Sequence, residues 1–429
     1  MTGHAWFKTL PAEWALVELK WVARIYSGGT PDRSRPEFWT DGDIPWLASG
    51  CVNQWKVTEP SEYITKKGFE ASSARFVPPG AVLIGLAGQG KTKGTAALSL
   101  IEATINQSVA AIVCGSALDP RFLHYWLSVN HSNIRGLSGG DLRDGLNHGH
   151  VGAIPVPLPP RVLQTRIADY LDRETATIDA LIEKQRQLSD ALRTRRRAAV
   201  LARTGFLGVK PTSAASSEPW LESAPSHWSR MHVRRLFDLT SGAGFPPELQ
   251  GVTDEELAFY KVRDLGRTDS YGRLGEPEDT ISRETADKLR AKVLPSGTLV
   301  MAKIGAALLL GRIRMATRPS CIDNNMLALS PKSLLYPRYA TYMLEGLLLD
   351  RLVQPGAVPS LNEREFRRTV FPVPPLDEQR EIADHLDRET AKIDALIAKA
   401  ERFIELAQER RAALITAAVT GQIEIPTED

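Results

Sequence analysis

The chain has 429 residues, 43% of them hydrophobic and 24% charged, with a formal net charge of +2 at pH 7. This composition excludes a disordered or collagen-like chain, and the length allows two to four domains. No apolar run is long enough to cross a membrane, and the first residues lack the pattern of a secretory signal. The three widely spaced cysteines fit a reducing compartment and exclude a four-cysteine zinc site. We therefore expect a cytoplasmic protein of more than one domain.

Residues 1–156 predict a first globular domain of mixed α and β structure. Short apolar runs such as 81–84 alternate with turn residues and favour strands, whereas residues 121–129 are typical of a helix. Asn147 stands in a turn-like context where capping is the simpler role. His148 and His150 have no cysteine or carboxylate cluster beside them, so we interpret them as loop residues and expect no metal site.

Residues 85–92 of this domain match the phosphate-binding pattern G-x-x-x-x-G-K-[ST]. Such a loop must open a helix, so that the helix N-terminus faces the phosphates. Gly94 and Thr95 disfavour a first helical turn, and residues 96–101 favour a strand. We interpret the match as a glycine hairpin that carries Lys91 and Lys93 to a ligand, and keep a nucleotide-binding ATPase as an alternative.

A long helix is predicted next, within a segment assigned to residues 157–206. It spans Arg161 to Thr204, and Gly205 is a typical helix stop. Proline-rich residues 155–160 precede it, and we expect them to act as a hinge. A seam of mostly apolar side chains recurs every seven residues, which favours a coiled coil. These positions are Leu171, Ile178, Gln185, Leu192 and Ala199, with Leu181 and Leu188 in a companion row.

The same plan follows a second time. Residues 207–224 are rich in Ser, Ala and Pro and predict a linker, and residues 225–372 predict a second mixed domain. Within the second domain, residues 339–349 are typical of a helix, and Asn362 stands in the same context as Asn147. A second long helix is predicted from Leu376 to Thr420, before Gly421, within a segment assigned to residues 373–421, and residues 422–429 form a tail. Its seven-residue seam is Leu386, Ile393, Ala400, Ala407 and Leu414, with Leu396 and Phe403 in the companion row.

An internal repeat relates the two halves. Residues 167–183 and 382–398 are identical at fourteen of seventeen positions, at an offset of 215. Residues 161–205 carry a net charge of +4, and residues 376–421 carry −3. Matching seams and opposite charges favour pairing of the helices with each other. Separate packing of each helix on its own domain is the alternative.

The helical repeat resembles a known family. The pattern PPLxEQxxIAxxLD from residue 374, followed by IDxLI from residue 393, is similar to the helical region of specificity subunits of type I restriction-modification systems. The upstream copy departs from the pattern at Leu163, where the second copy has Glu378. The resemblance covers nearly the whole chain, because the order of domains and helices also matches.

The resemblance implies an α+β architecture with two globular target recognition domains separated by a long antiparallel two-helix coiled coil. It implies a non-catalytic subunit that binds an asymmetric bipartite DNA target, with one half-site per domain and a spacing fixed by the helices. The implied partners are double-stranded DNA, two methyltransferase subunits and restriction or motor subunits, without a membrane. S-adenosylmethionine, ATP and Mg²⁺ are expected in those partner subunits and no cofactor in this chain. A coiled-coil scaffold without sequence specificity remains an alternative.

Candidate contact residues follow from this reading. DNA phosphates and base edges require Arg, Lys and polar side chains. The first domain offers Arg33, Arg35, Lys66, Lys67, Arg75, Lys91, Lys93, Arg135 and Arg143. The second offers Arg263, Arg267, Tyr271, Arg273, Lys303, Arg312 and Arg314, and glycines near 267–273 suggest a flexible contact loop. Polar residues present in both helices, which we expect to be exposed, are candidates for the methyltransferase-facing surface: Gln164, Asp172, Arg173, Gln379, Asp387 and Arg388.

Overall fold

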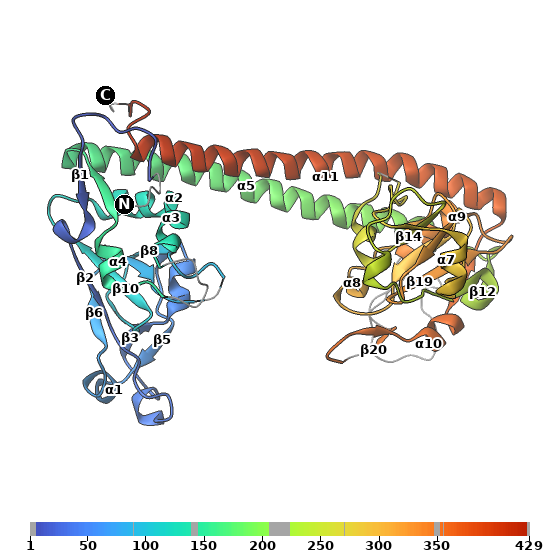
Figure 1. Cartoon of the computed structure of the whole chain (residues 1–429), viewed down its shortest axis with the longest axis horizontal. Coiled ribbons are helices and arrows are strands. Elements are labelled where there is room, and N and C mark those ends of the chain that lie inside the picture. The colour runs from blue at the N-terminus through green and yellow to red at the C-terminus, as the bar shows by residue number, and fades with distance from the viewer. Residues whose placement is uncertain are drawn as a thin grey trace. The chain divides into compact units, whose positions relative to one another are not determined.

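The computed structural model describes residues 6–88, 90–138, 145–205, 224–269, 271–346, 352–354 and 356–426. The chain divides into two compact units: unit 1 is residues 1–184 with 403–429, and unit 2 is residues 185–402. Each unit combines a mixed α and β domain with one end of each long helix (Figure 1). The α+β class predicted from the sequence is confirmed. The division between the units falls within the long helices, and the predicted linker, apart from Ala224, lies outside the described residues.

Unit 1 is built on two sheets, in the orders β2-β10-β7-β8-β4 and β5-β3-β9-β6, with β1 paired to β11. The strands are β1 (Ala15–Glu18), β2 (Ala23–Ser27), β3 (Ile44–Leu47), β4 (Lys56–Val57), β5 (Glu62–Ile64), β6 (Arg75–Val77), β7 (Val82–Gly85), β8 (Ala96–Ser99), β9 (Ala103–Ile105), β10 (Val109–Cys114) and β11 (Pro155–Leu158). The helices are η1 (Leu19–Trp21), η2 (Pro36–Phe38), η3 (Ser49–Asn53), α1 (Lys66–Glu70), α2 (Pro120–Val129), α3 (His131–Gly136) and α4 (His148–Gly152). Helix α2 packs on β7 and β8.

Unit 2 contains sheets in the orders β13-β19-β16-β17 and β15-β14-β18, with β12 paired to β22 and β20 paired to β21. The strands are β12 (Ser229–His232), β13 (Phe237–Ser241), β14 (Leu257–Tyr260), β15 (Thr280–Ile281), β16 (Leu299–Ala302), β17 (Arg314–Met315), β18 (Ser320–Ile322), β19 (Met326–Pro331), β20 (Val353–Gln354), β21 (Ser360–Leu361) and β22 (Val370–Val373). The helices are α6 (Val233–Leu236), η5 (Pro247–Leu249), η6 (Val262–Gly266), α7 (Arg283–Lys288), α8 (Ala306–Leu309), α9 (Pro337–Glu345) and α10 (Glu363–Arg368).

The two domains share one topology. The order β2-β10-β7-β8 in unit 1 has the same connectivity as β13-β19-β16-β17 in unit 2, and β3 pairs in parallel with β9 as β14 does with β18. Helix α9 corresponds to α2, and it begins and ends earlier than the predicted 339–349. The repeat read from the helices therefore extends through the folded domains, whose sequences diverge.

Helices α5 (Arg161–Arg203) and α11 (Leu376–Val419) begin and end within one residue of the predicted bounds. Each is followed by a glycine at positive φ, Gly205 at 81° and Gly421 at 68°, which gives a helix C-terminus its left-handed residue. In unit 1 the start of α5 lies against the end of α11, where Arg411 pairs with Asp179 at 2.9 Å. In unit 2 the end of α5 lies against the start of α11, so the helices run antiparallel.

The companion row of the helical seam was predicted wrongly. Leu181, Leu188, Leu396 and Phe403 are 40–49% exposed. The buried row lies one residue further along α5, about 100° around the helix. Its members are Thr175, Ile182 and Ser189. In the described part of the structure, each long helix therefore exposes apolar side chains to solvent.

The proline-rich segments are strands rather than hinges. Pro155 to Leu158 pair with Glu18 to Ala15, and Val370 to Val373 pair with β12 in the same way. Proline is tolerated in such an edge pair because the strand needs no donor on its outer side. These strands lead directly into α5 and α11, and they fix where each helix leaves its domain.

A P-x-x-W sequence occurs near the start of both domains, at Pro11 and at Pro225, and its tryptophan packs on the end of a long helix in each unit. Trp14 donates its backbone N–H to Pro11, and Trp228 does the same to Pro225, both at 3.0 Å. A side chain at Gly421 would clash with Pro11 and Trp14, so the tryptophan packs on the glycine that ends α11. Gly205 lies against Trp228 in the same manner at the end of α5. Within the described ranges, no helix is both long and apolar enough to cross a membrane.

Candidate nucleic-acid interface

The basic candidates of unit 1 lie on several elements of its domain. Lys66 and Lys67 are exposed at the start of α1, Arg75 is exposed on β6, and Lys91 is exposed in the β7–β8 hairpin. These four cations are available to phosphates. Arg143 lies outside the described residues.

Arg33 belongs to a preorganised aromatic cluster. Its guanidinium lies 3.7 Å from the ring centroid of Trp39, and it donates to both oxygens of Glu62, at 2.5 and 2.9 Å. The Arg33 hydrogen bonds hold the pKa of Glu62 below its usual value. A guanidinium stacked on indole and held by a carboxylate has a fixed plane, which suits directional hydrogen bonding. Arg35 follows in the same segment, 5.4 Å from the ring of Phe38.

The match to the phosphate-binding pattern is a hairpin, as the sequence reading favoured. Strand β7 ends at Gly85 and β8 begins at Ala96, and the two strands pair antiparallel. A helix N-terminus that would face phosphates is therefore missing after Lys91 in this described segment. Lys93 was wrongly assigned to the contact surface, because it is only 5% exposed. Arg135 of α3 supports the hairpin by donating to the carbonyl of Gly90.

The basic candidates of unit 2 are mostly paired with acids. Arg263 contacts Glu278 at 2.7 Å and Asp279 at 2.8 Å, and Arg267 also pairs with Glu278. Arg312 is exposed.

Two further candidates of unit 2 have mainly structural contacts. Lys303 is largely buried and donates to Ser241 at 2.9 Å. Arg314 donates to the carbonyl of Leu265 at 3.0 Å, and burial lowers the pKa of its guanidinium. Both side chains are committed to the domain, which argues against their assignment to DNA.

Tyr271 and Arg273 lie in a tight turn rather than in the flexible loop that we expected. The Asp269 carboxylate accepts hydrogen bonds from the backbone N–H of Tyr271 and of Arg273, each at 2.9 Å, and from Nε of Arg273 at 2.6 Å. Although burial of Asp269 acts in the opposite direction, these hydrogen bonds lower the pKa of its carboxyl. Gly272 adopts a φ of 70°, which the turn requires. The side chain of Tyr271 remains 40% exposed.

The repeated glutamines are buried, which corrects their assignment to an exposed partner surface. Gln164 is 0% exposed and donates to the carbonyls of Ala117 and Pro159 at 2.9 and 2.8 Å. Its own carbonyl accepts from the backbone N–H of Asp119 at 2.7 Å. Gln379 is 1% exposed and repeats the arrangement with Leu334, Pro374 and Tyr336. Each glutamine therefore clamps the first turn of a long helix to the preceding domain.

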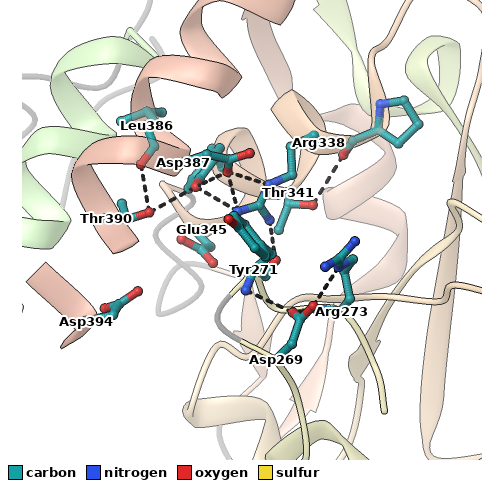
Figure 2. A network of polar contacts seen from close by, with 12 residues as sticks. Asp269, Tyr271, Arg273, Arg338, Thr341, Glu345, Leu386, Asp387, Thr390 and Asp394 are labelled. Carbon is teal, nitrogen blue, oxygen red and sulfur yellow. Dashed lines mark hydrogen bonds and ion pairs between the residues drawn. The ribbon is translucent and has the colours of Figure 1, made fainter. Parts of the chain in front are cut away.

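The repeated aspartates also face the domains. Asp387 accepts a hydrogen bond from Nε of Arg338 at 2.6 Å (Figure 2). It also accepts from the hydroxyl of Tyr342 at 2.6 Å, and this hydroxyl lies 3.1 Å from Oγ1 of Thr390. In unit 1, Asp172 accepts from Arg121 at 3.1 Å and from Tyr125 at 3.0 Å. The aspartates therefore join α5 to α2 and α11 to α9 rather than presenting a free carboxylate to a partner.

Arg338 and Tyr342, with their equivalents Arg121 and Tyr125, bind the repeated aspartates, and the sequence analysis did not single them out. Both pairs read R-x-x-x-Y, at an offset of 217 in the chain. A search for repeated residue pairs at offsets near 215 would have found them, because their offset of 217 is close to that of the repeated aspartates.

The remaining candidates have plain structural settings. Arg173 and Arg388 are exposed on α5 and α11, so their partner-binding role stays a prediction. Asn147 caps α4 by accepting from His150 at 2.8 Å, and Asn362 caps α10 by accepting from Glu365 at 3.2 Å. The described residues contain no group of three or more side chains that could hold a metal ion.

Comparisons with known proteins agree with this architecture. The family model for the type I restriction modification DNA specificity domain matches residues 11–189 and 253–405. The chain is 25% identical over 181 residues to the specificity subunit of the Escherichia coli type I restriction enzyme EcoR124I/EcoR124II. That alignment covers 41% of this chain and 44% of the relative, so it spans less than half of the relative's length.

Solved structures extend the similarity in fold to nearly the whole chain. One comes from a study of complex assembly and conformational transition of the type I R-M system, with a TM-score of 0.64 and 18% identity over 97% of this chain and 100% of that one. The crystal structure of the HsdS subunit from Thermoanaerobacter tengcongensis has a TM-score of 0.50 and 18% identity, over 97% and 99% of the two chains. Since the family model covers well over half of the chain in two copies, this protein belongs to the type I restriction-modification DNA specificity domain family.

Proposed function

We propose that this chain is a DNA sequence-recognition subunit of a type I restriction-modification complex. The observation that carries the proposal is that the same helix-anchoring scaffold occurs twice in the chain, each time with a domain of different sequence. The helix-anchoring groups Gln164 and Asp172 recur as Gln379 and Asp387 with the same kinds of partners. Outside that scaffold the domains diverge, as different half-sites would require. The target is then asymmetric and bipartite, with one half-site per domain.

In this proposal the exposed cations contact DNA phosphates, and a smaller set of side chains contacts base edges. Lys66, Lys67, Arg75 and Lys91 of unit 1 and Arg312 of unit 2 fit the first role, because their side chains are exposed. Substitution of a phosphate-contacting lysine weakens binding to every duplex alike and lowers the salt dependence of binding.

The long helices are proposed to set the half-site spacing and to dock two methyltransferase subunits. Exposed apolar side chains recur on them at the repeat offset of 215, Leu181 with Leu396 and Leu188 with Phe403. Exposed apolar groups repeated at equivalent positions fit two copies of one partner. The chain itself is then non-catalytic: the partners hold S-adenosylmethionine, ATP and Mg²⁺, methylate an adenine flipped from the duplex, and cleave DNA.

The docking surface has a direct test. The double variant Leu181→Glu with Leu396→Glu places carboxylates in both copies of the surface and should abolish co-purification with the methyltransferase. Leu309→Glu is a matched control, because Leu309 is also an exposed leucine but belongs to α8 of the second domain rather than to a long helix. Arg173→Glu with Arg388→Glu tests the polar part of the same surface. Unchanged co-purification of both double variants would remove the helices from the docking surface.

Sequence recognition is tested by expressing the chain with its neighbouring candidate methyltransferase and mapping methylated adenines by single-molecule sequencing. We expect one motif of two unlike halves at a constant spacing. An intact complex that methylates without any motif would contradict sequence recognition and favour the scaffold alternative. ATP hydrolysis by the isolated chain, lost in Lys91→Ala, would contradict the non-catalytic assignment.

A further inference from the structure

The described residues 268–269 and 271–274 form a turn of unit 2 that is absent from the corresponding described segment of unit 1, residues 54–55. Lys56 pairs in parallel with Leu98 of β8, and Arg273 pairs in parallel with Met315 of β17, so the two basic residues occupy equivalent positions. Two residues separate η3 from Lys56, whereas six separate η6 from Arg273. The segment is thus four residues longer in unit 2, and we define its described residues 268–269 and 271–274 as the Tyr271 turn.

The Tyr271 turn is fastened to the domain at defined points. Thr268 and Leu274 form an antiparallel bridge, and Leu274 donates its N–H to the carbonyl of Met315 at 2.9 Å. Asp269 holds the inside of the turn by accepting from two backbone N–H groups and the Arg273 side chain. This network leaves the side chains of Tyr271 and Arg273 partly exposed, with the Arg273 guanidinium 5.1 Å from the tyrosine ring centroid.

Arg338 connects this turn to helix α11. Figure 2 shows its guanidinium between the carboxylate of Asp387 and the backbone of Tyr271. Nε donates to Asp387 at 2.6 Å, Nη2 donates to the Tyr342 hydroxyl at 2.8 Å, and Nη1 donates to the Tyr271 carbonyl. The Arg338 side chain is largely buried. A planar fork with five donors is suited to hold three partners at fixed angles.

Unit 1 provides an internal comparison. Arg121, the equivalent of Arg338, uses Nη1 for two carboxylates of α5, Asp169 at 2.6 Å and Asp172 at 3.1 Å. The residue equivalent to Asp169 in the second copy is Asp384, and in the described part of unit 2 Arg338 makes no ion pair with it. The second copy has therefore exchanged a contact within the scaffold for a contact with the inserted turn.

We infer that Arg338 is a positioning residue for recognition of the second half-site, which acts by setting the place of the Tyr271 turn against α11. This inference rests on the proposed function. Tyr271 and Arg273 then contact the DNA of the second half-site, and Arg338 contacts no DNA. Helix α11 thereby fixes a recognition element of the second domain through Asp387 and Arg338. In the described part of the first domain Asp172 instead pairs directly with Lys56, the residue equivalent to Arg273, at 3.5 Å.

The test uses the complex with its methyltransferase and duplexes carrying the motif found by methylation mapping. Binding is measured at fixed salt on three duplexes: the intact target, the first half-site substituted, and the second half-site substituted. We expect Arg338→Met to weaken binding to the intact target at least tenfold. The loss should vanish on the duplex whose second half-site is already substituted, and discrimination at the first half-site should remain unchanged. Arg121→Met is the matched control and should leave second-half-site discrimination as in the parent.

A second variant keeps the inference testable where Arg338→Met lowers stability. Tyr271→Ala removes an exposed ring and retains the backbone carbonyl, so it should preserve the melting temperature and reduce second-half-site discrimination. The double variant of Tyr271→Ala with Arg338→Met should lose less second-half-site discrimination than the product of the two single losses, because both substitutions act through one turn. Arg338→Lys should not restore discrimination, since a lysine ammonium cannot reproduce the planar fork.

The outcomes separate the inference from the function on which it rests. Equal losses at both half-sites, or unchanged discrimination in both Arg338→Met and Tyr271→Ala, would overturn the inference while sequence recognition stands. A parent complex that binds all three duplexes equally would overturn the proposed function and the inference with it.

Discussion

Buried glutamines carry much of the connection between domain and helix at the residue scale. Gln164 and Gln379 each make three hydrogen bonds at 2.7–2.9 Å to buried or partly buried backbone groups. Removing such a side chain leaves two carbonyls and one N–H without partners, and each lost partner costs more than the hydrogen bond itself contributed. Their presence in both copies is therefore explained by anchoring the helices rather than by a partner.

Gln379→Ala should lower the free energy of unfolding by about 2 kcal/mol, because one buried and two partly buried backbone groups lose their partner. Thermal or urea denaturation followed by circular dichroism measures the change. Gln408→Ala, an exposed position on the same helix, should change it by less than about 0.5 kcal/mol. Equal effects of the two substitutions would contradict the anchoring role.

His124 makes the stability of the first domain depend on pH. Burial lowers its pKa from 6.5 to about 4, although the hydrogen bond with the carbonyl of Ala96 opposes the shift. The unfolded state binds a proton that the folded state excludes between these two values. The stabilisation is therefore complete above pH 6.5 and falls by about 3 kcal/mol as the pH drops toward 4.

His124→Gln should flatten this pH dependence, because glutamine can donate to Ala96 without titrating. The measurement is the melting temperature between pH 4 and pH 7 for the parent and the variant. The variant should be less stable than the parent at pH 7, since its contact with Trp55 is reduced, yet lose less stability on acidification. The same slope in both proteins would exclude His124 as its source.

Symmetric ion pairs fix the register of the two long helices at the element scale. Arg196 contacts Asp394 at 2.9 Å in unit 2, and Arg411 contacts Asp179 at 2.9 Å in unit 1. Both pairs combine equivalent residues at an offset of 215, so each helix contributes the arginine once and the aspartate once. Arg196 also reaches Glu345 of α9 at 3.1 Å, which ties the register to the second domain.

A double-mutant cycle of Arg196→Ala and Asp394→Ala should give a coupling energy of about 1–2 kcal/mol, because the guanidinium is largely withdrawn from water. The pair of Arg193 with Glu401 is the control: both side chains are about half exposed, and its coupling should stay below about 0.5 kcal/mol. Denaturant titrations of the four proteins in each cycle supply the values. A coupling energy no larger than that of the control pair would mean that apolar packing alone sets the register of the two helices.

At the scale of the whole molecule, the two long helices are proposed to set the separation between the two DNA half-sites. Deleting one heptad from each helix, residues 185–191 and 400–406, retains the phase of the seam and shortens each helix by about 10 Å. If the helices set the half-site separation, the spacing in the methylated motif should shorten by about three base pairs while both halves stay the same. Methylation mapping of the shortened complex measures this directly. A changed half-site with the old spacing would contradict the proposal.

The sequence by itself determined the features that arise from periodicity and identity: two copies of one plan, two long helices with their glycine ends, the α+β class, and the hairpin at Gly85. The repeat follows from the identity of segments 215 residues apart, and the other features depend on local preferences that act over a few residues. The tertiary structure decided which polar residues are buried and which apolar ones are exposed. Gln164 and Leu181 were misjudged because solvent exposure depends on the neighbours that the fold supplies. The turn at Tyr271 and its fastening by Arg338 were also out of reach, since residues distant in the chain meet there only after folding.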